Sequence, residues 1–203
     1  VRFMVAHAPR EIRRAADSLA AFLGAEGQDI GFVENATAGI NAVLRSFDFK
    51  AGDEVITTDH VYNAVRNTLH HRLEAAGARL VTVEHGMPVL SAGDIRDRVM
   101  AAVSPATRMI VIDHVASFSA AVLPVGEIAK SARARGVAVL VDGAHGPGLL
   151  DLDVPALGAD WYVGNCHKWL CAPKGAGFLR AAPTRRERLH PPVISHALDQ
   201  GFV

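Results

Sequence analysis

The sequence predicts an α/β fold in which a mostly parallel central sheet is flanked by helices on both faces. Two observations predict this fold. Segments with helical periodicity alternate along the chain with short runs of apolar and β-branched residues. One such run, 137–141, is apolar throughout, which is typical of a parallel strand buried on both faces. A chain of 203 residues, half of them hydrophobic, can bury the core of one large domain.

The predicted helices rest on apolar periodicity and on residues that start or stop helices. Residues 10–23 repeat apolar side chains at helical spacing, and Gly24 follows as a stop. Ser91 can cap a later helix, with Asp94 three residues on, and Pro124 suits a first helical turn. In order, the predicted helices are 10–23, 37–47, 61–76, 91–103 and a last one from Pro124 to near Gly136.

The predicted strands are short apolar runs bounded by turn-forming residues. In order, these seven runs are 30–33, 55–58, 80–83, 109–112, 137–141, 161–163 and 176–179. Because helices separate most of them, crossover connections keep the strands largely parallel and cover both faces of the sheet.

Polar side chains follow several of these strands at the point where each strand ends. The strings are Asn35-Ala36-Thr37, Asp59-His60, Asp113-His114 and Asp142-Gly143-Ala144-His145. Because open α/β sheets bind ligands at the carboxyl ends of their strands, we expect these residues to meet at one edge.

One further string supplies a lysine. Lys168 lies in Gly164-Asn165-Cys166-His167-Lys168-Trp169, twenty-six residues after Asp142. Such a lysine is usually solvated surface, and an aspartate after a strand is usually a turn former. Together, however, an amine that can hold an aldehyde and a carboxylate that can keep a pyridine nitrogen protonated indicate bound pyridoxal phosphate. Gly143 and Gly146 would let the backbone approach such a flat ligand.

The start of the predicted helix 37–47 offers a phosphate site. Free backbone N–H groups at Ala36-Thr37 and the threonine hydroxyl could cradle an anion, whereas a simple helix cap at Asn35 or Thr37 is the competing interpretation. His60 and Tyr62 open the next helix, where a flat ring could stack on a cofactor, and a packed histidine is the competing interpretation there.

Composition argues against several classes of partner. Lys plus Arg and Asp plus Glu number 21 each, so no positive field indicates nucleic acid or an anionic membrane. Neither a signal peptide nor an 18-residue apolar span is evident, and Cys166 and Cys171 do not form a disulfide pattern. These features predict a cytoplasmic protein with small-molecule or protein partners.

Four strings give the chain a resemblance to a known family. They are Asn35-Ala36-Thr37, Asp59-His60-Val61-Tyr62-Asn63-Ala64, Asp142-Gly143-Ala144-His145-Gly146-Pro147-Gly148 and the run 164–178, GNCHKWLCAPKGAGF. From about Leu19 onward, the chain resembles the fold-type I, class V aminotransferase superfamily, which includes cysteine desulfurases. Its isopenicillin N epimerase-like branch is the most similar, and the last two strings are the most specific.

The resemblance implies a role for each matching residue. Lys168 is expected to hold pyridoxal phosphate covalently, Asp142 to face its pyridine nitrogen, and His145 to contact its ring hydroxyl. The remaining residues expected to bind the cofactor are Ala36, Thr37, Asn165 and His167 at the phosphate, His60 or Tyr62 on the ring face, and Ser117 beside the ring.

The resemblance also implies a larger enzyme. Residues 1–203 match the large, cofactor-binding domain and look truncated at both ends. Relatives continue with a Gly-Thr motif that reaches the neighbouring subunit's phosphate and with a small domain whose arginine binds the substrate carboxylate. This chain stops at Gln200-Gly201-Phe202-Val203, so we expect a fragment or a short member, assembled as a homodimer with sites near the interface.

The predicted reaction is pyridoxal-phosphate chemistry at the α-carbon of an amino acid, with epimerisation as the nearest family label. Freed Lys168 would serve as the base, and Asp142 must stay ionised beside the ring nitrogen. A C–S lyase, cysteine desulfurase-like enzyme or aminotransferase is the second hypothesis, although a desulfurase needs a loop cysteine and Cys166 and Cys171 flank the lysine instead. Two hypotheses of a different class are a metal-dependent hydrolase built from the aspartate–histidine pairs and a non-catalytic dimerisation module.

Overall fold

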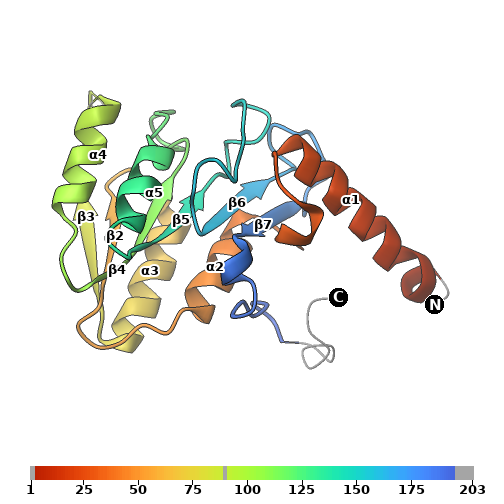
Figure 1. The fold of residues 1–203 in the computed structure, drawn as a ribbon, viewed down its shortest axis with the longest axis horizontal. Helices are drawn as coiled ribbons and strands as arrows, with labels where there is room; N and C mark the ends of the chain where they lie inside the picture. Colours follow the sequence, from red (N-terminus) through yellow and green to blue (C-terminus); the bar gives the residue numbers. More distant parts are fainter. Residues whose placement is uncertain (1–2, 89–90, 195–203) are drawn as a thin grey trace.

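The computed structural model describes residues 3–88 and 91–194 and confirms the predicted α/β fold class. Seven strands form one sheet in the order β1-β7-β6-β5-β4-β2-β3 (Figure 1). The strands are β1 (Ile30–Val33), β2 (Glu54–Thr58), β3 (Arg79–Val83), β4 (Thr107–Asp113), β5 (Ala138–Asp142), β6 (Trp161–Asn165) and β7 (Gly177–Ala181). Strand β7 pairs antiparallel with β1 and β6, and the other described pairings are parallel, so the sheet is mostly parallel, as predicted. The chain end at 200–203 lies outside the described residues.

The helices agree with the predicted ones to within a few residues. They are α1 (Ala8–Phe22), α2 (Ala36–Ser46), α3 (Asn63–Ala76), α4 (Ala92–Ala101) and α5 (Val125–Arg133), with single turns at Phe3–His7, Gly27–Asp29 and Pro183–Arg185. Ser91 caps α4 as predicted, since its hydroxyl accepts the Asp94 N–H at 3.1 Å. Pro124 lies one position before α5 instead of inside it. None of the described helices is long and apolar enough to cross a membrane.

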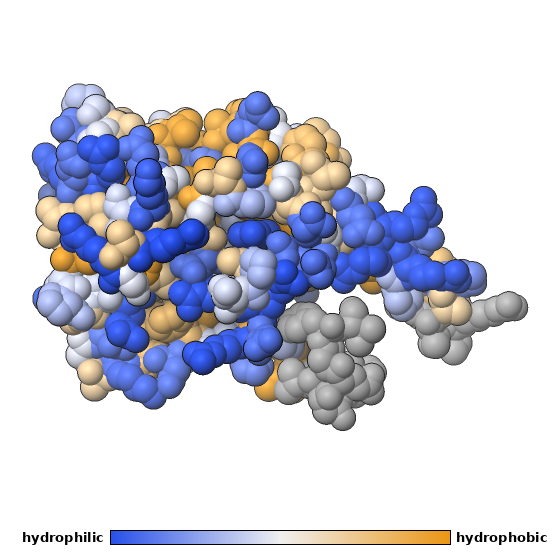
Figure 2. Space-filling model, in the orientation of Figure 1, coloured by the Kyte–Doolittle hydropathy of each residue, from blue (hydrophilic) through white to orange (hydrophobic). Residues whose placement is uncertain are grey.

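Two apolar layers cover the sheet. In β4, Ile110 and Ile112 face one layer, which includes buried residues of α1, α4 and α5, whereas Met109 and Val111 face the other, formed by α2 and α3. This strict alternation follows from the two-residue repeat of a strand. Helix α1 extends beyond the rest of the molecule and is largely hydrophilic on the face shown (Figures 1 and 2). The result is a three-layer domain whose strand ends remain available at two opposite edges.

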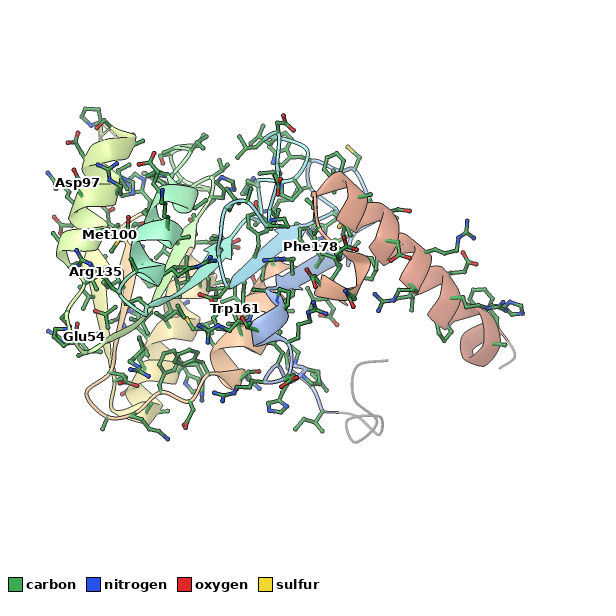
Figure 3. The ribbon with its side chains drawn as sticks, in the orientation of Figure 1. Glu54, Asp97, Met100, Arg135, Trp161 and Phe178 are labelled. Carbon is green, nitrogen blue, oxygen red and sulfur yellow. The ribbon has the colours of Figure 1, made fainter. Side chains whose placement is uncertain are left out.

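The amino edge of the sheet, where the parallel strands begin, carries charges that are paired within the protein. Glu54, which is labelled in Figure 3, starts β2. Its side chain is buried. Its carboxylate accepts the Ser104 hydroxyl at 2.7 Å and pairs with Arg79, and these contacts hold its pKa below the ordinary value despite burial. Asp160, just before β6, accepts the Val139 N–H at 2.8 Å and Arg185 at 2.7 Å. These ion pairs and hydrogen bonds fasten neighbouring strands together.

Candidate active site

The carboxyl ends of the parallel strands bring the predicted polar residues to the opposite edge. Strands β1, β2, β4, β5 and β6 all end there, and α2 and α3 both begin there. The residues that follow these strand ends or complete them are Asn35, Ala36, Thr37, Asp59, His60, Asp113, His114, Asp142, His145, Asn165, His167 and Lys168. The topology therefore places side chains that are far apart in the sequence along a single edge.

Asp142 has a carboxylate neighbour, Asp113, which the sequence placed on the same edge of the sheet but not among the residues expected to bind the cofactor. Asp113 ends β4 directly opposite Asp142 in the parallel register, so the two side chains project from the same face of the sheet. Both residues are buried, with relative exposures of 3% for Asp113 and 5% for Asp142. The position of Asp113, one strand over from Asp142 at the end of an apolar run, was the available sequence signal.

The two carboxyls differ in their partners. Asp142 Oδ1 accepts the Ala144 N–H at 3.0 Å, whereas both oxygens of Asp113 are buried without a hydrogen-bond partner among the described residues. Burial and the nearby charge of Asp142 raise the pKa of Asp113 to about 8, against a smaller lowering by Lys168 and by the Tyr62 N–H, which approaches without completing a hydrogen bond. Burial also raises the pKa of Asp142. This pair of acids is therefore suited to a positively charged partner.

Lys168 lies within electrostatic reach of both carboxyls and contacts His145. Its Nζ is 2.9 Å from His145 Nε2, and His145 Nδ1 accepts the Trp169 indole N–H at 3.2 Å. Burial lowers the pKa of Lys168, while Asp142 and Asp113 oppose that shift. Burial, followed by the Lys168 charge, lowers the pKa of His145. The geometry brings the three residues with the strongest sequence signal, Asp142, His145 and Lys168, into one cluster.

The glycines after Asp142 pack against protein. A Cβ added to Gly143 would lie 2.1 Å from the Tyr162 ring, and one added to Gly146 would lie 2.1 Å from its hydroxyl. The Tyr162 ring therefore explains why glycine is needed at both positions, and the close approach of a flat ligand to this backbone stays a prediction. That hydroxyl lies 3.1 Å from His114 Nδ1, and burial lowers the pKa of His114 to about 4. His114 and Tyr162 thus support the loop after β5.

The start of α2 is held by two asparagines. Asn35 caps the helix, since its side chain accepts the Ala38 N–H at 2.9 Å, which confirms the capping role considered for that residue. Asn165 accepts the Ala36 N–H at 2.8 Å, a contact that sequence reasoning missed. Within the described chain, the N–H and hydroxyl of Thr37 are not used in any hydrogen bond. Thr37 is therefore the group at this helix start with donors available for an anion.

Three other predicted residues line one hollow of about 560 Å³: His60, Tyr62 and Ser117. His60 is buried and its Nδ1 lies 2.9 Å from the Ser119 hydroxyl, whereas Tyr62 is 48% exposed. Either ring can reach this hollow. Just after β6, His167 Nδ1 donates to the Ala176 carbonyl at 2.9 Å, which orients the ring and leaves Nε2 for another contact.

The three aspartate–histidine pairs proposed for a metal-dependent hydrolase do not converge on one group of ligands within the part of the chain that the structure describes. Among the described residues, the group whose ligand atoms come within 4.8 Å of one another consists of Asp59, His60 and His85. Asp59 already accepts the backbone N–H groups of His85 and Gly86, and the His60 and His85 rings pack with centroids 3.9 Å apart. Neither Asp113 nor Asp142 joins this group. These contacts position the His60 side chain, and Lys168, His145 and Asp142 are not part of this group.

Comparison with protein families tests the resemblance that the sequence motifs indicate. The family model described as Aminotransferase class-V matches residues 3–198. The chain belongs to the class-V aminotransferase family. This membership confirms the predicted family and fold class. It also identifies pyridoxal phosphate as the cofactor that the site residues should fit.

The similar proteins include isopenicillin N epimerases, L-cysteine desulfhydrases, a probable cysteine desulfurase and a cystine C-S lyase. Isopenicillin N epimerase of Streptomyces clavuligerus is 36% identical over 97% of this chain and 50% of its own length. Putative L-cysteine desulfhydrase 1 of Oryza sativa subsp. japonica is 35% identical over 94% of this chain and 43% of its own. A solved cystine C-S lyase in complex with cysteine persulfide has a TM-score of 0.81 at 25% identity, over 92% of this chain and 51% of that one. The chain thus spans about half the length of the relatives it matches.

Proposed function

We propose that this class-V aminotransferase family member binds pyridoxal phosphate through Lys168 and acts at the α-carbon of an amino acid, as an isopenicillin N epimerase-like enzyme. The observation that carries the proposal is the cluster at the carboxyl edge: an amine whose pKa is lowered by burial lies beside His145 and within reach of buried Asp142. When bound, the cofactor supplies an electron-withdrawing ring that weakens bonds at the substrate α-carbon.

The residues present fit this cofactor. Asp142 offers a buried carboxylate to a protonated ring nitrogen, which would offset the desolvation that raises its pKa. Thr37, at the start of α2, offers an N–H and a hydroxyl to the phosphate, and Asn165 and His167 flank the same strand end. His60 or Tyr62 covers the ring face, Ser117 lines the same hollow, and Ala36 contributes structure through its bond to Asn165.

Lys168 also handles the proton. An uncharged amine near the α-carbon removes a proton from one face, and return of a proton to the other face completes epimerisation.

C–S bond cleavage is the second candidate, because cysteine desulfhydrases and a cystine C-S lyase are among the similar proteins. Cys171 is exposed and Cys166 is buried, and both flank Lys168 in the sequence.

The rest of the assembly follows from the half-length match. We infer that residues 1–203 are the cofactor-binding domain of a longer enzyme, that this enzyme is a cytoplasmic homodimer, and that its partner of interest is an amino-acid substrate. The half-length coverage supports the domain assignment, and the shared family supports an amino-acid substrate.

Borohydride reduction tests the central assignment. Chain incubated with pyridoxal phosphate should become yellow, and reduction should fix the cofactor to the peptide that contains Lys168. Lys168→Ala should abolish this labelling, whereas Lys174→Ala, which removes an exposed lysine six residues away, should leave it intact. Cofactor fixed mainly at Lys174 would overturn the proposal. Incubation with isopenicillin N or cystine then separates epimerisation from C–S cleavage.

A further inference from the structure

Trp169 contacts His145 on the side opposite Lys168. The Trp169 indole N–H donates to His145 Nδ1 at 3.2 Å, and His145 Nε2 lies 2.9 Å from Lys168 Nζ. An indole nitrogen donates and never accepts. Nδ1 must therefore be the unprotonated, accepting nitrogen of the histidine.

This requirement determines the protonation of both partners. A neutral imidazole that accepts at Nδ1 carries its proton on Nε2, so Nε2–H faces Lys168 as a donor. An ammonium group has three N–H donors and no lone pair, and it could not accept that hydrogen bond. The 2.9 Å contact is satisfied only when Lys168 is an uncharged amine that accepts from His145.

The groups around Lys168 and His145 shift the charge state of Lys168 in opposite directions. Burial lowers the pKa values of Lys168 and His145, which favours the neutral form of each. Asp142 and Asp113 face Lys168 from β5 and β4 and favour its ammonium form. No other charged residue contributes to the pKa shift of Lys168 within the described chain. The Nε2–H donor of His145 therefore favours the uncharged amine of Lys168, whereas the two carboxyls favour its ammonium form.

We propose that Trp169 is a positioning residue that fixes His145 as the Nε2–H tautomer and thereby holds Lys168 as an uncharged amine. The uncharged amine is the form that attacks an aldehyde. This inference deepens the proposed function, because it rests on Lys168 as the residue that captures the cofactor. Trp169 acts through His145 without touching the amine.

Nitrogen-15 NMR of the histidine side chains gives a direct test. In chain cleared of cofactor, His145, assigned by its loss in His145→Gln, should show a protonated Nε2 and an unprotonated Nδ1 at neutral pH. Trp169→Phe keeps an aromatic ring and removes the donor, so both tautomers should then be populated. Trp169 is 51% exposed, and circular dichroism checks that the variant folds. A wild-type signal with protonated Nδ1 would overturn the proposal.

A labelling cycle tests the consequence for the amine. Acetic anhydride modifies uncharged amines, and mass spectrometry reports Lys168 against exposed Lys174 as an internal reference. Trp169→Phe should slow labelling of Lys168 at pH 8 by about tenfold, the effect of one hydrogen bond on an amine's charge state. In a His145→Leu background no side chain can pass the effect of the indole donor to the amine, so adding Trp169→Phe should change the rate less than about twofold.

The labelling rates of four proteins are compared: the wild type, Trp169→Phe, and the His145→Leu variant with and without Trp169→Phe. Equal slowing in both backgrounds would show that Trp169 only shapes the local fold, and no slowing in either would show that it does not act on the amine. Both experiments use chain without cofactor, so they are independent of the borohydride result. Expected labelling together with no covalent cofactor would reject the proposed function and leave the tautomer inference standing.

Discussion

The two edges of the sheet use buried acids in opposite ways. At the amino edge, Glu54 is surrounded by Ser104, Thr107 and Arg79, and these contacts lower its pKa. At the carboxyl edge, Asp113 is more deeply buried, has neither oxygen satisfied within the described chain, and has its pKa raised to about 8. Polar groups that are fully paired stabilise a fold, whereas unpaired buried groups are kept at a cost that functional sites accept. The comparison separates the edge that holds the sheet together from the edge available to a ligand.

The largest expected effect comes from removing the charge at the carboxyl edge. Asp142→Asn keeps the size of the side chain but removes the anion that supports a positive ring nitrogen. Cofactor should still bind, whereas exchange of the substrate α-proton in deuterated water should fall by about 10²–10³-fold in an enzyme form that has activity. Exchange at the wild-type rate would mean that Asp142 serves only as a turn residue.

The next effect concerns stability at the amino edge. Glu54→Gln should lower the free energy of unfolding by about 2 kcal/mol at neutral pH, because a buried charged hydrogen-bond network is broken, and it should leave cofactor affinity unchanged. Since the folded-state pKa of Glu54 is lowered, its contribution is present above the unfolded pKa and is lost as the pH falls through the folded pKa. Urea unfolding at several pH values measures this. Arg79→Ala, which removes the exposed partner alone, is the control, and a loss of cofactor binding in Glu54→Gln would contradict the separation of the two edges.

The smallest effect has the opposite sign. Asp113→Asn removes an acid whose folded-state pKa is raised, so it should stabilise the cofactor-free chain by about 1 kcal/mol at pH 8, or about 2–4 °C in Tm. The cost of ionising Asp113 builds as pH rises from its ordinary pKa to about 8, so the gain should be small at pH 4. Thermal unfolding at both pH values measures it. The same gain at pH 4 would indicate a packing effect unrelated to charge.

The sequence predicted the architecture well because the architecture depends on local signals. Apolar runs such as 137–141 mark buried strands, and glycine, proline and serine mark helix ends, so all seven strands and five long helices were found. The largest difference is at α5, which ends at Arg133 instead of near Gly136. Residues 134–136 form a turn, closed by hydrogen bonds to Ala132 and Arg133, before the next strand.

The site was predictable only in part, because its geometry depends on contacts between distant segments. The strings around Asp142 and Lys168 carry enough family-specific detail to be found without a structure. The bond from Ala36 to Asn165, the contact of Tyr162 with Gly143, and the stacking of His85 on His60 join residues whose spacing has no local pattern. Such contacts follow from strand order and register, which a single sequence does not encode locally.

The strand order also bears on when the site can exist during synthesis. Strand β1 lies at one end of the sheet and pairs with β7. The first strand along the chain is therefore paired with the last. As the chain leaves the ribosome, Thr37 is made early, but the segment that precedes it has no strand partner until Gly177–Ala181 emerges. The anchoring lysine and its asparagine neighbour are made shortly before that strand. The nascent chain therefore becomes competent for the cofactor in one late event, and shorter nascent chains are not expected to capture free pyridoxal phosphate.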